Sequence, residues 1–123
     1  MSIKLIASDL DGTLLTDKKE LSPGTRKALD MAAAQGIYIV PTTGRSFEAV
    51  PEMIREYPGV KYLITANGGA VYSAEAGKRI YQCLLSPESV DAAIAVRQRE
   101  KIVMEAVIDG IPDRKSTRLN SSH

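Results

Sequence analysis

Residues Ile3 to Leu15 read I-K-L-I-A-S-D-L-D-G-T-L-L, a short apolar segment that ends in two carboxylates, glycine and threonine. A brief, bounded apolar run from Ile3 to Ala7 is typical of a buried parallel strand. Asp9 and Asp11 then lie at its carboxyl end, where open α/β sheets bind their ligands. Because residues two apart in an extended segment point the same way, both carboxylates can face one site.

Two carboxylates held close together repel each other unless a cation or a shared proton relieves the repulsion. Mg²⁺ is the cofactor that we expect at Asp9 and Asp11, since it is a hard dication that prefers oxygen ligands. Gly12 permits a sharp turn beside them. The alternative is that Asp-x-Asp-Gly is only a turn, because aspartate and glycine both favour turns for local reasons.

A helix and a second strand follow. Ser22-Pro23 predicts a helix with serine as N-cap and proline in its first turn, and Gly36 predicts the end of that helix. The apolar face expected on this helix consists of Ala28, Leu29, Met31, Ala32 and Ala33. Ile37 to Val40 predicts a second buried strand, and the order strand, helix, strand indicates a right-handed βαβ unit with parallel strands.

The second strand ends in the loop Pro41 to Ser46, P-T-T-G-R-S, which the parallel geometry puts beside Asp9 and Asp11. A hydroxyl and free backbone N–H groups in such a loop can hold a phosphate oxygen. The alternative is a glycine turn leading into a helix capped by Ser46. The position of the loop favours the functional interpretation, because both motifs fall at the carboxyl ends of consecutive strands.

Further elements are predicted along the chain. Phe47 to Tyr57 predicts a helix with Val50, Met53 and Ile54 facing the sheet and Pro51 disturbing its first turns. Tyr62 to Ala66 predicts a third buried strand, which Asn67 ends, either lining the site or only forming a turn. The remaining elements are a hairpin of 70–72 and 79–84 that turns near 74–77, a helix from Ser86-Pro87 to about Glu100 with a face of Val90, Ala93, Ile94 and Val96 or Arg97, and a strand over Ile102 to Ile108.

Three motifs together, D-L-D-G-T-L-L, then T-G-R, then A-N-G-G-A-V-Y, resemble the haloacid dehalogenase (HAD) superfamily of phosphohydrolases, in its Cof-type (IIB-like) branch. The resemblance covers Ile3 to about Ile108. It implies an α/β fold: the N-terminal part of a doubly wound, Rossmann-like parallel sheet over residues 1–84, ending in a hinge hairpin. Residues 85–112 would begin an inserted α/β cap domain. In this family the first strand lies centrally, so here one of its edges is expected to be unpaired and apolar.

The resemblance also implies residue roles. Asp9 would be the nucleophile, Asp11 the general acid and base, and both would hold Mg²⁺. The implied substrate contacts are Leu10, Thr43, Gly44, Arg45 and Asn67, with the Thr43 hydroxyl and the Gly44 N–H on the phosphoryl group. Arg45 either contacts substrate or pairs with an acidic residue to brace its loop, and bracing is preferred. Lys18 and Lys19, at the tip of a flap over Leu14 to Leu21, are expected to be solvated.

The expected function is a Mg²⁺-dependent phosphatase of small phosphorylated metabolites of the sugar phosphate type, acting through an aspartyl-phosphate. The family also uses a later lysine and a later acidic motif, and the sequence up to Pro112 contains neither. An alternative is therefore a catalytically inactive, truncated product that at most binds Mg²⁺ or phosphate weakly. A second alternative is a sugar phosphomutase of the same superfamily.

The last residues, Asp113 to His123, read D-R-K-S-T-R-L-N-S-S-H and resemble a common sequencing-adapter oligonucleotide read as codons. We expect this segment to be a non-native, unpacked tail. Three of the 16 basic residues and one of the 15 acidic residues lie in it, which leaves the remainder with a net charge of −1. That charge gives no electrostatic case for nucleic acid or an anionic membrane as partner.

The single cysteine, Cys83, excludes an intrachain disulfide and a zinc site built from cysteines, and it is expected to be a packing residue. The single histidine is the last residue, His123, which argues against a catalytic triad. No apolar run approaches membrane-spanning length and no signal peptide pattern is present, so a cytoplasmic location is expected. The oligomeric state stays open.

Overall fold

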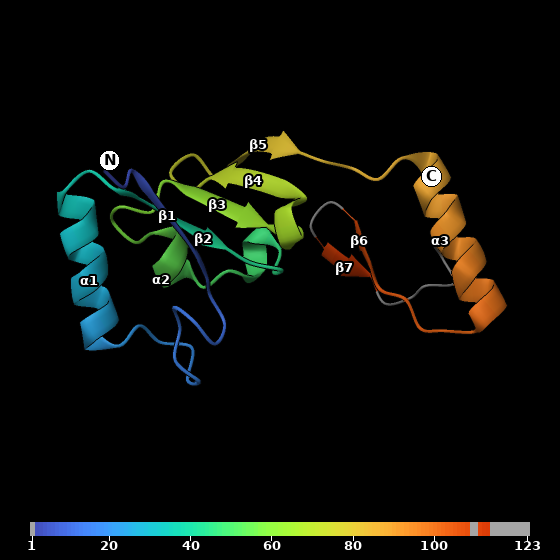
Figure 1. The fold of residues 1–123 in the computed structure, drawn as a ribbon, viewed down its shortest axis with the longest axis horizontal. Coiled ribbons are helices and arrows are strands. Elements are labelled where there is room, and N and C mark those ends of the chain that lie inside the picture. Colours follow the sequence, from blue (N-terminus) through green and yellow to red (C-terminus); the bar gives the residue numbers. More distant parts are fainter. Residues whose placement is uncertain (1, 109–110, 114–123) are drawn as a thin grey trace. The chain divides into compact units, whose positions relative to one another are not determined.

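The computed structural model describes residues 2–108 and 111–113 of the 123-residue chain. The chain divides into two compact units, Met1–Gln82 and Cys83–His123, which are described separately. The first unit is a β-sheet with helices, and the second contains one long helix and a small hairpin (Figure 1). The expected α/β class is therefore confirmed.

The sheet of the first unit has five strands in the order β1-β2-β3-β4-β5. They are β1 (Leu5–Asp9), β2 (Tyr38–Thr42), β3 (Tyr62–Thr65), β4 (Ala70–Ser73) and β5 (Lys78–Gln82). The first three strands are parallel, as the βαβ pattern predicted, and β4 and β5 pair antiparallel. The predicted hairpin thus extends the same sheet, and the described sheet is mixed instead of purely parallel.

Helix α1 (Pro23–Ala34) begins and ends as the sequence predicts. The Ser22 hydroxyl accepts a hydrogen bond from the Thr25 N–H at 3.2 Å, and Gly36 adopts φ 77° just after the helix. Leu29 and Ala32 are buried, but the prediction was wrong for Met31, which is 56% exposed, and for Ala28, which is also exposed. Met31 lies two residues from Leu29, roughly 200° around the helix, so both cannot face the sheet.

The helix predicted over Phe47 to Tyr57 is instead two short pieces, the 3₁₀ turn η1 (Phe47–Ala49) and α2 (Glu52–Arg55). Pro51 separates them because it has no N–H to donate and because its ring disfavours helical backbone at the preceding residue. That residue, Val50, is extended, with φ −71° and ψ 130°. Val50 and Ile54 are buried as predicted, whereas Met53 is exposed.

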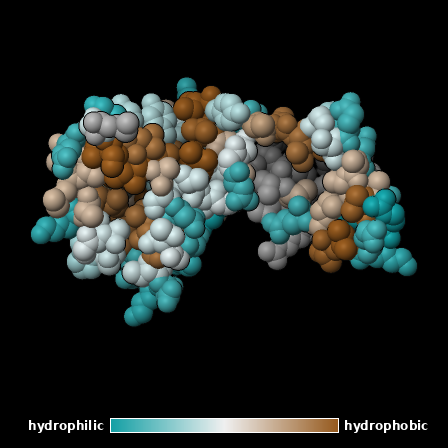
Figure 2. All heavy atoms as spheres, viewed as in Figure 1, coloured by the Kyte–Doolittle hydropathy of each residue, from teal (hydrophilic) through white to brown (hydrophobic). Residues whose placement is uncertain are grey.

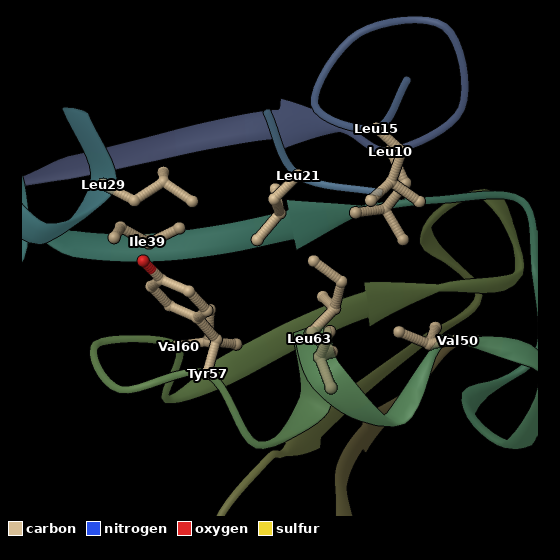
Figure 3. Close-up of a cluster of buried hydrophobic side chains, with 10 residues drawn as sticks. Leu10, Leu15, Leu21, Leu29, Ile39, Val50, Tyr57, Val60 and Leu63 are labelled. Atoms are coloured by element: carbon tan, nitrogen blue, oxygen red, sulfur yellow. The ribbon is translucent and has the colours of Figure 1, made fainter. Parts of the chain in front are cut away.

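The core of this unit lies on one face of the sheet (Figure 3). Ile39 of β2 and Leu63 of β3 belong to the same cluster as Leu29 of α1 and Ile54 of α2, so both helices cover that face. The other members are Leu10, Leu15, Leu21, Val50, Tyr57 and Val60. Burial of each such side chain contributes about 1.5–3 kcal/mol. The leucines around the flap therefore anchor the loop that follows β1.

Strand β1 was expected to be buried, and this is wrong: Leu5 is 49% exposed and Ile6 is exposed as well. The reason is its place at the end of the described sheet, where it pairs only with β2. Leu5 is in register with Tyr38, and Tyr38 and Tyr62 are also exposed. Figure 2 shows hydrophobic side chains gathered on the surface over β1 and its neighbours. The unpaired, apolar edge expected for this strand is present.

In the second unit, α3 (Pro87–Glu100) is capped as predicted by Ser86, whose hydroxyl accepts from the Ser89 N–H at 3.1 Å. Its half-buried face is Val90, Ala93, Ile94 and Arg97, so Arg97 and not Val96 completes it. The strand predicted over 102–108 is shorter in the structure, where β6 covers only Ala106–Ile108. It pairs antiparallel with β7 (Ile111–Asp113).

Asp113, the first residue of the tail expected over 113–123, pairs with Ala106 in this hairpin. Residues 114–123 lie outside the described part of the chain. Cys83 is exposed, contrary to the packing role expected for it. Across residues 2–108 and 111–113, no helix has the length and apolar character needed to cross a membrane.

Candidate active site

Three loops meet at the carboxyl ends of the parallel strands. Asp9 is in register with Thr42, so the chain leaves β1 and β2 at neighbouring points. The Thr43 N–H donates to the Ile64 carbonyl at 2.9 Å, and the Asn67 N–H donates to the Thr43 carbonyl at 3.1 Å. These backbone hydrogen bonds fix the second and third loops to each other.

A cleft of about 520 Å³ opens at this point. Four residues singled out in the sequence line it: Asp9, Thr43, Gly44 and Asn67. Ala7 and Thr42 complete the lining, and neither was predicted from the sequence. A signal for Ala7 was available, because it lies two residues before Asp9 and therefore on the same side of the strand.

The Asp9 side chain is exposed, and its Oδ1 accepts a hydrogen bond from the Leu10 N–H at 2.9 Å. This bond orients the carboxylate at the end of β1. The Leu10 side chain is fully buried in the core. Leu10 can therefore take part in the site only through its main chain.

Asp11 has different surroundings and does not belong to the lining of this cleft. Its Oδ1 accepts from Lys19 Nζ at 2.8 Å and from Arg45 Nη2 at 2.7 Å, and its Oδ2 accepts from Arg45 Nε at 2.9 Å. The hydrogen bonds from Arg45, and then that from Lys19, hold the pKa of Asp11 well below its usual range. The same contact with Asp11 raises the pKa of Arg45.

Arg45 is held at three points, because its Nη1 also donates to the Ala49 carbonyl at 2.8 Å. This arrangement braces the loop after β2 against the loop after β1. The expectation that Lys19 is merely solvated is wrong, since its ammonium pairs with Asp11. A usable signal was the pair Leu15 and Leu21, two apolar residues that bring the charged turn between them back toward the strand end.

The absence of a side chain at Gly44 leaves room for the Asn67 side-chain amide. A Cβ at position 44 would lie 2.9 Å from Asn67 Oδ1, so only glycine fits without displacing the amide. Asn67 has φ 55° and ψ 35°, and Ala66 before it has φ 50°. Asparagine tolerates this left-handed conformation, but alanine adopts it at a cost, and such strain is concentrated at functional sites.

Thr43 is buried, and its Oγ1 accepts from the Arg45 N–H at 3.0 Å. That contact uses an oxygen lone pair and leaves the hydroxyl proton to donate. Ser46 is extended at the start of η1, and its hydroxyl makes no capping bond there. The alternative in which this loop serves only to lead into a capped helix is therefore weakened.

The donor set suits Mg²⁺ in kind, because carboxylate oxygens are its preferred protein ligands. Within residues 2–108 and 111–113, however, no group of three or more Asp, Glu, His or Cys residues is placed to hold a metal. Asp9 offers a carboxylate that no cation engages among the described contacts, whereas two cations occupy Asp11. The described residues therefore fit a part of a magnesium site.

The fold and the loops define a class of protein: an α/β scaffold whose first parallel strand ends in a carboxylate that lines a cleft. The chain matches the haloacid dehalogenase-like hydrolase family over residues 6–111. It belongs to that family, as the resemblance of its motifs predicted.

Two curated relatives show how much of the chain is shared. It is 40% identical over 74 residues to the 5-amino-6-(5-phospho-D-ribitylamino)uracil phosphatase YcsE of Bacillus subtilis. That match covers 60% of this chain and 30% of the relative. It is 33% identical over 107 residues to the HMP-PP phosphatase of Klebsiella pneumoniae, and that match covers 87% of this chain and 39% of the relative. The chain therefore spans about a third of the length of these relatives.

Among solved structures, the HAD subclass IIB sugar phosphatase BT4131 is similar, with a TM-score of 0.71 and 26% identity. The match covers 86% of this chain and 41% of that one. The doubly wound core and the Cof-type branch predicted from the motifs agree with this likeness.

Proposed function

We propose that the whole protein hydrolyses phosphoric monoesters of small metabolites, of the sugar phosphate type, through an aspartyl-phosphate at Asp9. The observation that carries the proposal is the single cleft that Asp9 shares with Thr43, Gly44 and Asn67. The substrate class is supported by the relatives, whose names describe a phosphorylated ribityl compound and a sugar phosphate as substrates. The cytoplasmic location expected from the sequence stays a prediction.

In the proposed reaction, an Asp9 carboxylate oxygen attacks phosphorus, the ester P–O bond breaks, and the leaving oxygen takes a proton from Asp11. A water that gives a proton to Asp11 then attacks the same phosphorus, the bond to Asp9 breaks, and inorganic phosphate is released. A carboxylate nucleophile divides a difficult hydrolysis into two easier displacements. The Thr43 hydroxyl and the Gly44 N–H donate to the phosphoryl oxygens.

Asp9 and Asp11 would hold Mg²⁺, and the bound ion would supply neutralisation of phosphoryl charge. Asp11 has to release at least one oxygen for this role, because both of its oxygens accept from cationic groups. The same contacts favour ionised Asp11, which suits the later step in which Asp11 takes a proton from water. The proton that Asp11 gives to the leaving oxygen in the first step is bound against this preference. Arg45 acts through Asp11, and Leu10 contributes its main-chain N–H.

The second candidate is that these 123 residues are by themselves inactive. Two observations favour it: the partial magnesium ligand set among the described residues and the engagement of Asp11 by two cations. Loss of one charge-stabilising group costs about 3–4 kcal/mol in the transition state. The motif lysine and the acidic motif that the family carries later in the chain are both missing from the sequence before Pro112.

Phosphate release from an aryl phosphate in the presence of Mg²⁺ separates the two candidates. For the 123-residue chain we expect no release above that of its Asp9→Asn variant. For the longest protein that the gene encodes we expect release that Asp9→Asn abolishes. If that longer protein hydrolyses the ester equally well with Asp9→Asn, the proposed function is wrong. If the enzyme transfers the phosphoryl group to an added sugar phosphate instead of to water, the protein is a mutase.

A further inference from the structure

We propose that Lys19 is a positioning residue of this site: from the tip of the turn after β1, it fixes the orientation of the Asp11 carboxylate together with Arg45. The catalytic consequence rests on the proposed function, whereas the positioning itself does not. Lys19 Nζ and Arg45 Nη2 both lie on Oδ1 of Asp11, at 2.8 and 2.7 Å. One carboxylate oxygen is thus shared by cations from two different loops.

The turn that carries Lys19 has a defined position. The Thr16 N–H donates to the Glu20 carbonyl and the Lys19 N–H donates to the Thr16 carbonyl, both at 2.8 Å. Leu15 and Leu21 flank the turn and are buried in the core cluster. The ammonium is therefore held near Asp11 by a short closed turn with an apolar anchor on each side.

The backbone at Lys19 is unusual in a way that supports a role. Its φ is 61°, a left-handed conformation that is strained for a residue with a side chain. Glycine would adopt this conformation freely, yet the position holds a lysine whose side chain makes the ion pair. The strain is therefore accompanied by a specific contact with Asp11.

Lys19 and Arg45 hold Asp11 unequally. Arg45 contacts both carboxylate oxygens and the Ala49 carbonyl, and its side chain is 28% exposed. Lys19 contacts one oxygen, and its side chain is 53% exposed. An ammonium on a flexible stem exchanges partners more readily than a planar guanidinium held by a fork of hydrogen bonds. Arg45 therefore makes the larger contribution to the position of Asp11, and Lys19 adds a second constraint at Oδ1.

The first test is made on the 123-residue chain by NMR of the Asp11 side-chain carboxyl carbon and the Arg45 Nε–H. We expect Lys19→Met to shift or broaden both signals and Lys19→Arg to restore them. Lys18→Met is the matched control, since it removes the same charge from the neighbouring residue, and it should leave both signals in place. The backbone amide spectrum confirms that each variant is folded. Unchanged signals in a folded Lys19→Met chain would overturn the proposal.

The second test uses turnover by the longest protein that the gene encodes. Misplacement of a reacting group lowers the rate, so Lys19→Met should reduce kcat on the order of ten- to a hundredfold while KM stays within about twofold. Lys19→Arg should recover most of the loss, which a merely structural role would not require. A raised KM with unchanged kcat would overturn the positioning role. An inactive parent protein would refute the proposed function, and the NMR result would still decide the contact.

Discussion

Two aspartates that lie two positions apart in the sequence have different surroundings in the folded chain. Asp9 ends β1, lines the cleft and accepts one main-chain hydrogen bond. Asp11 lies past the strand, where Arg45 and Lys19 bind its carboxylate. An active site can assign the roles of nucleophile and proton carrier to two carboxylates by placing them in different environments. The roles proposed for the two residues rest on the family resemblance, and the low pKa of Asp11 suits the step in which it acts as a base.

The pH dependence of stability should reveal the Asp11 cluster. Arg45, and then Lys19, lower the folded-state pKa of Asp11 below its unfolded value of about 3.9. The stabilisation is therefore fully present above about pH 4 and is lost as the pH falls through the lower folded-state pKa. Because the Asp11 side chain is 38% exposed, we discount the effect to about 1 kcal/mol.

The measurement is urea unfolding of the parent chain and of Asp11→Asn from about pH 7 down to about pH 2. Near neutral pH we expect the unfolding free energy of the parent to exceed that of Asp11→Asn by about 1 kcal/mol. The difference should shrink as the pH falls below about 4. Asp17→Asn, on the same turn, is the matched control for loss of one negative charge. A gap between parent and Asp11→Asn that widens as the pH falls would contradict the account.

At the scale of the elements, the ends of helices are determined locally and the faces are determined by packing. Ser22, Ser86 and Gly36 act as the sequence predicts because capping depends on a few neighbouring residues. Met31 and Met53 were assigned to buried faces because they are apolar, yet both are exposed. Which apolar residues are buried depends on how the helix lies on the sheet, and periodicity alone does not give that orientation.

The site could be predicted from the sequence to the extent that it depends on strand ends. Asp9, Thr43, Gly44 and Asn67 line one cleft because parallel strands end at the same edge of a sheet. The ion pair between Lys19 and Asp11 was not predicted, since it depends on the closed turn over 16–20 and on a left-handed residue within it. The break at Pro51 was foreseen only as a disturbance, because the cost of proline depends on the competing loop conformation.

The cap of α1 offers a test at this scale. Ser22→Ala removes the hydroxyl that accepts from the Thr25 N–H, so unfolding free energy should fall by about 1 kcal/mol. Ser22→Asp keeps an acceptor and adds a negative charge at the helix N-terminus, so it should match or exceed the parent. Chemical denaturation followed by circular dichroism makes the comparison. An unchanged free energy of unfolding in Ser22→Ala would show that the cap contributes nothing.

At the scale of the whole molecule, the exposed edge and face of β1 have a consequence. An unpaired, apolar edge strand is a template for pairing with another chain. Leu5 is exposed on this strand, beside exposed Tyr38. We therefore expect the 123-residue chain to associate as its concentration rises, which light scattering measures directly.

Leu5→Lys should reduce this association, because a charged residue on an edge strand opposes intermolecular pairing. Met31→Lys, the same kind of change on the exposed side of α1, is the matched control and should leave association unchanged. A parent chain that stays a monodisperse monomer over the whole concentration range would contradict the role given to β1.

Mass spectrometry of the acid-quenched enzyme shows whether Asp9 forms a covalent bond to phosphorus. The longest protein that the gene encodes is mixed with Mg²⁺ and a small phosphate ester, quenched and digested. We expect a phosphoryl group on Asp9, its absence in Asp9→Asn, and slower turnover in Asp11→Asn, where loss of proton transfer costs on the order of 10²–10⁴-fold in rate. A phosphoryl adduct on the Asp9→Asn protein would contradict the assignment of Asp9 as nucleophile.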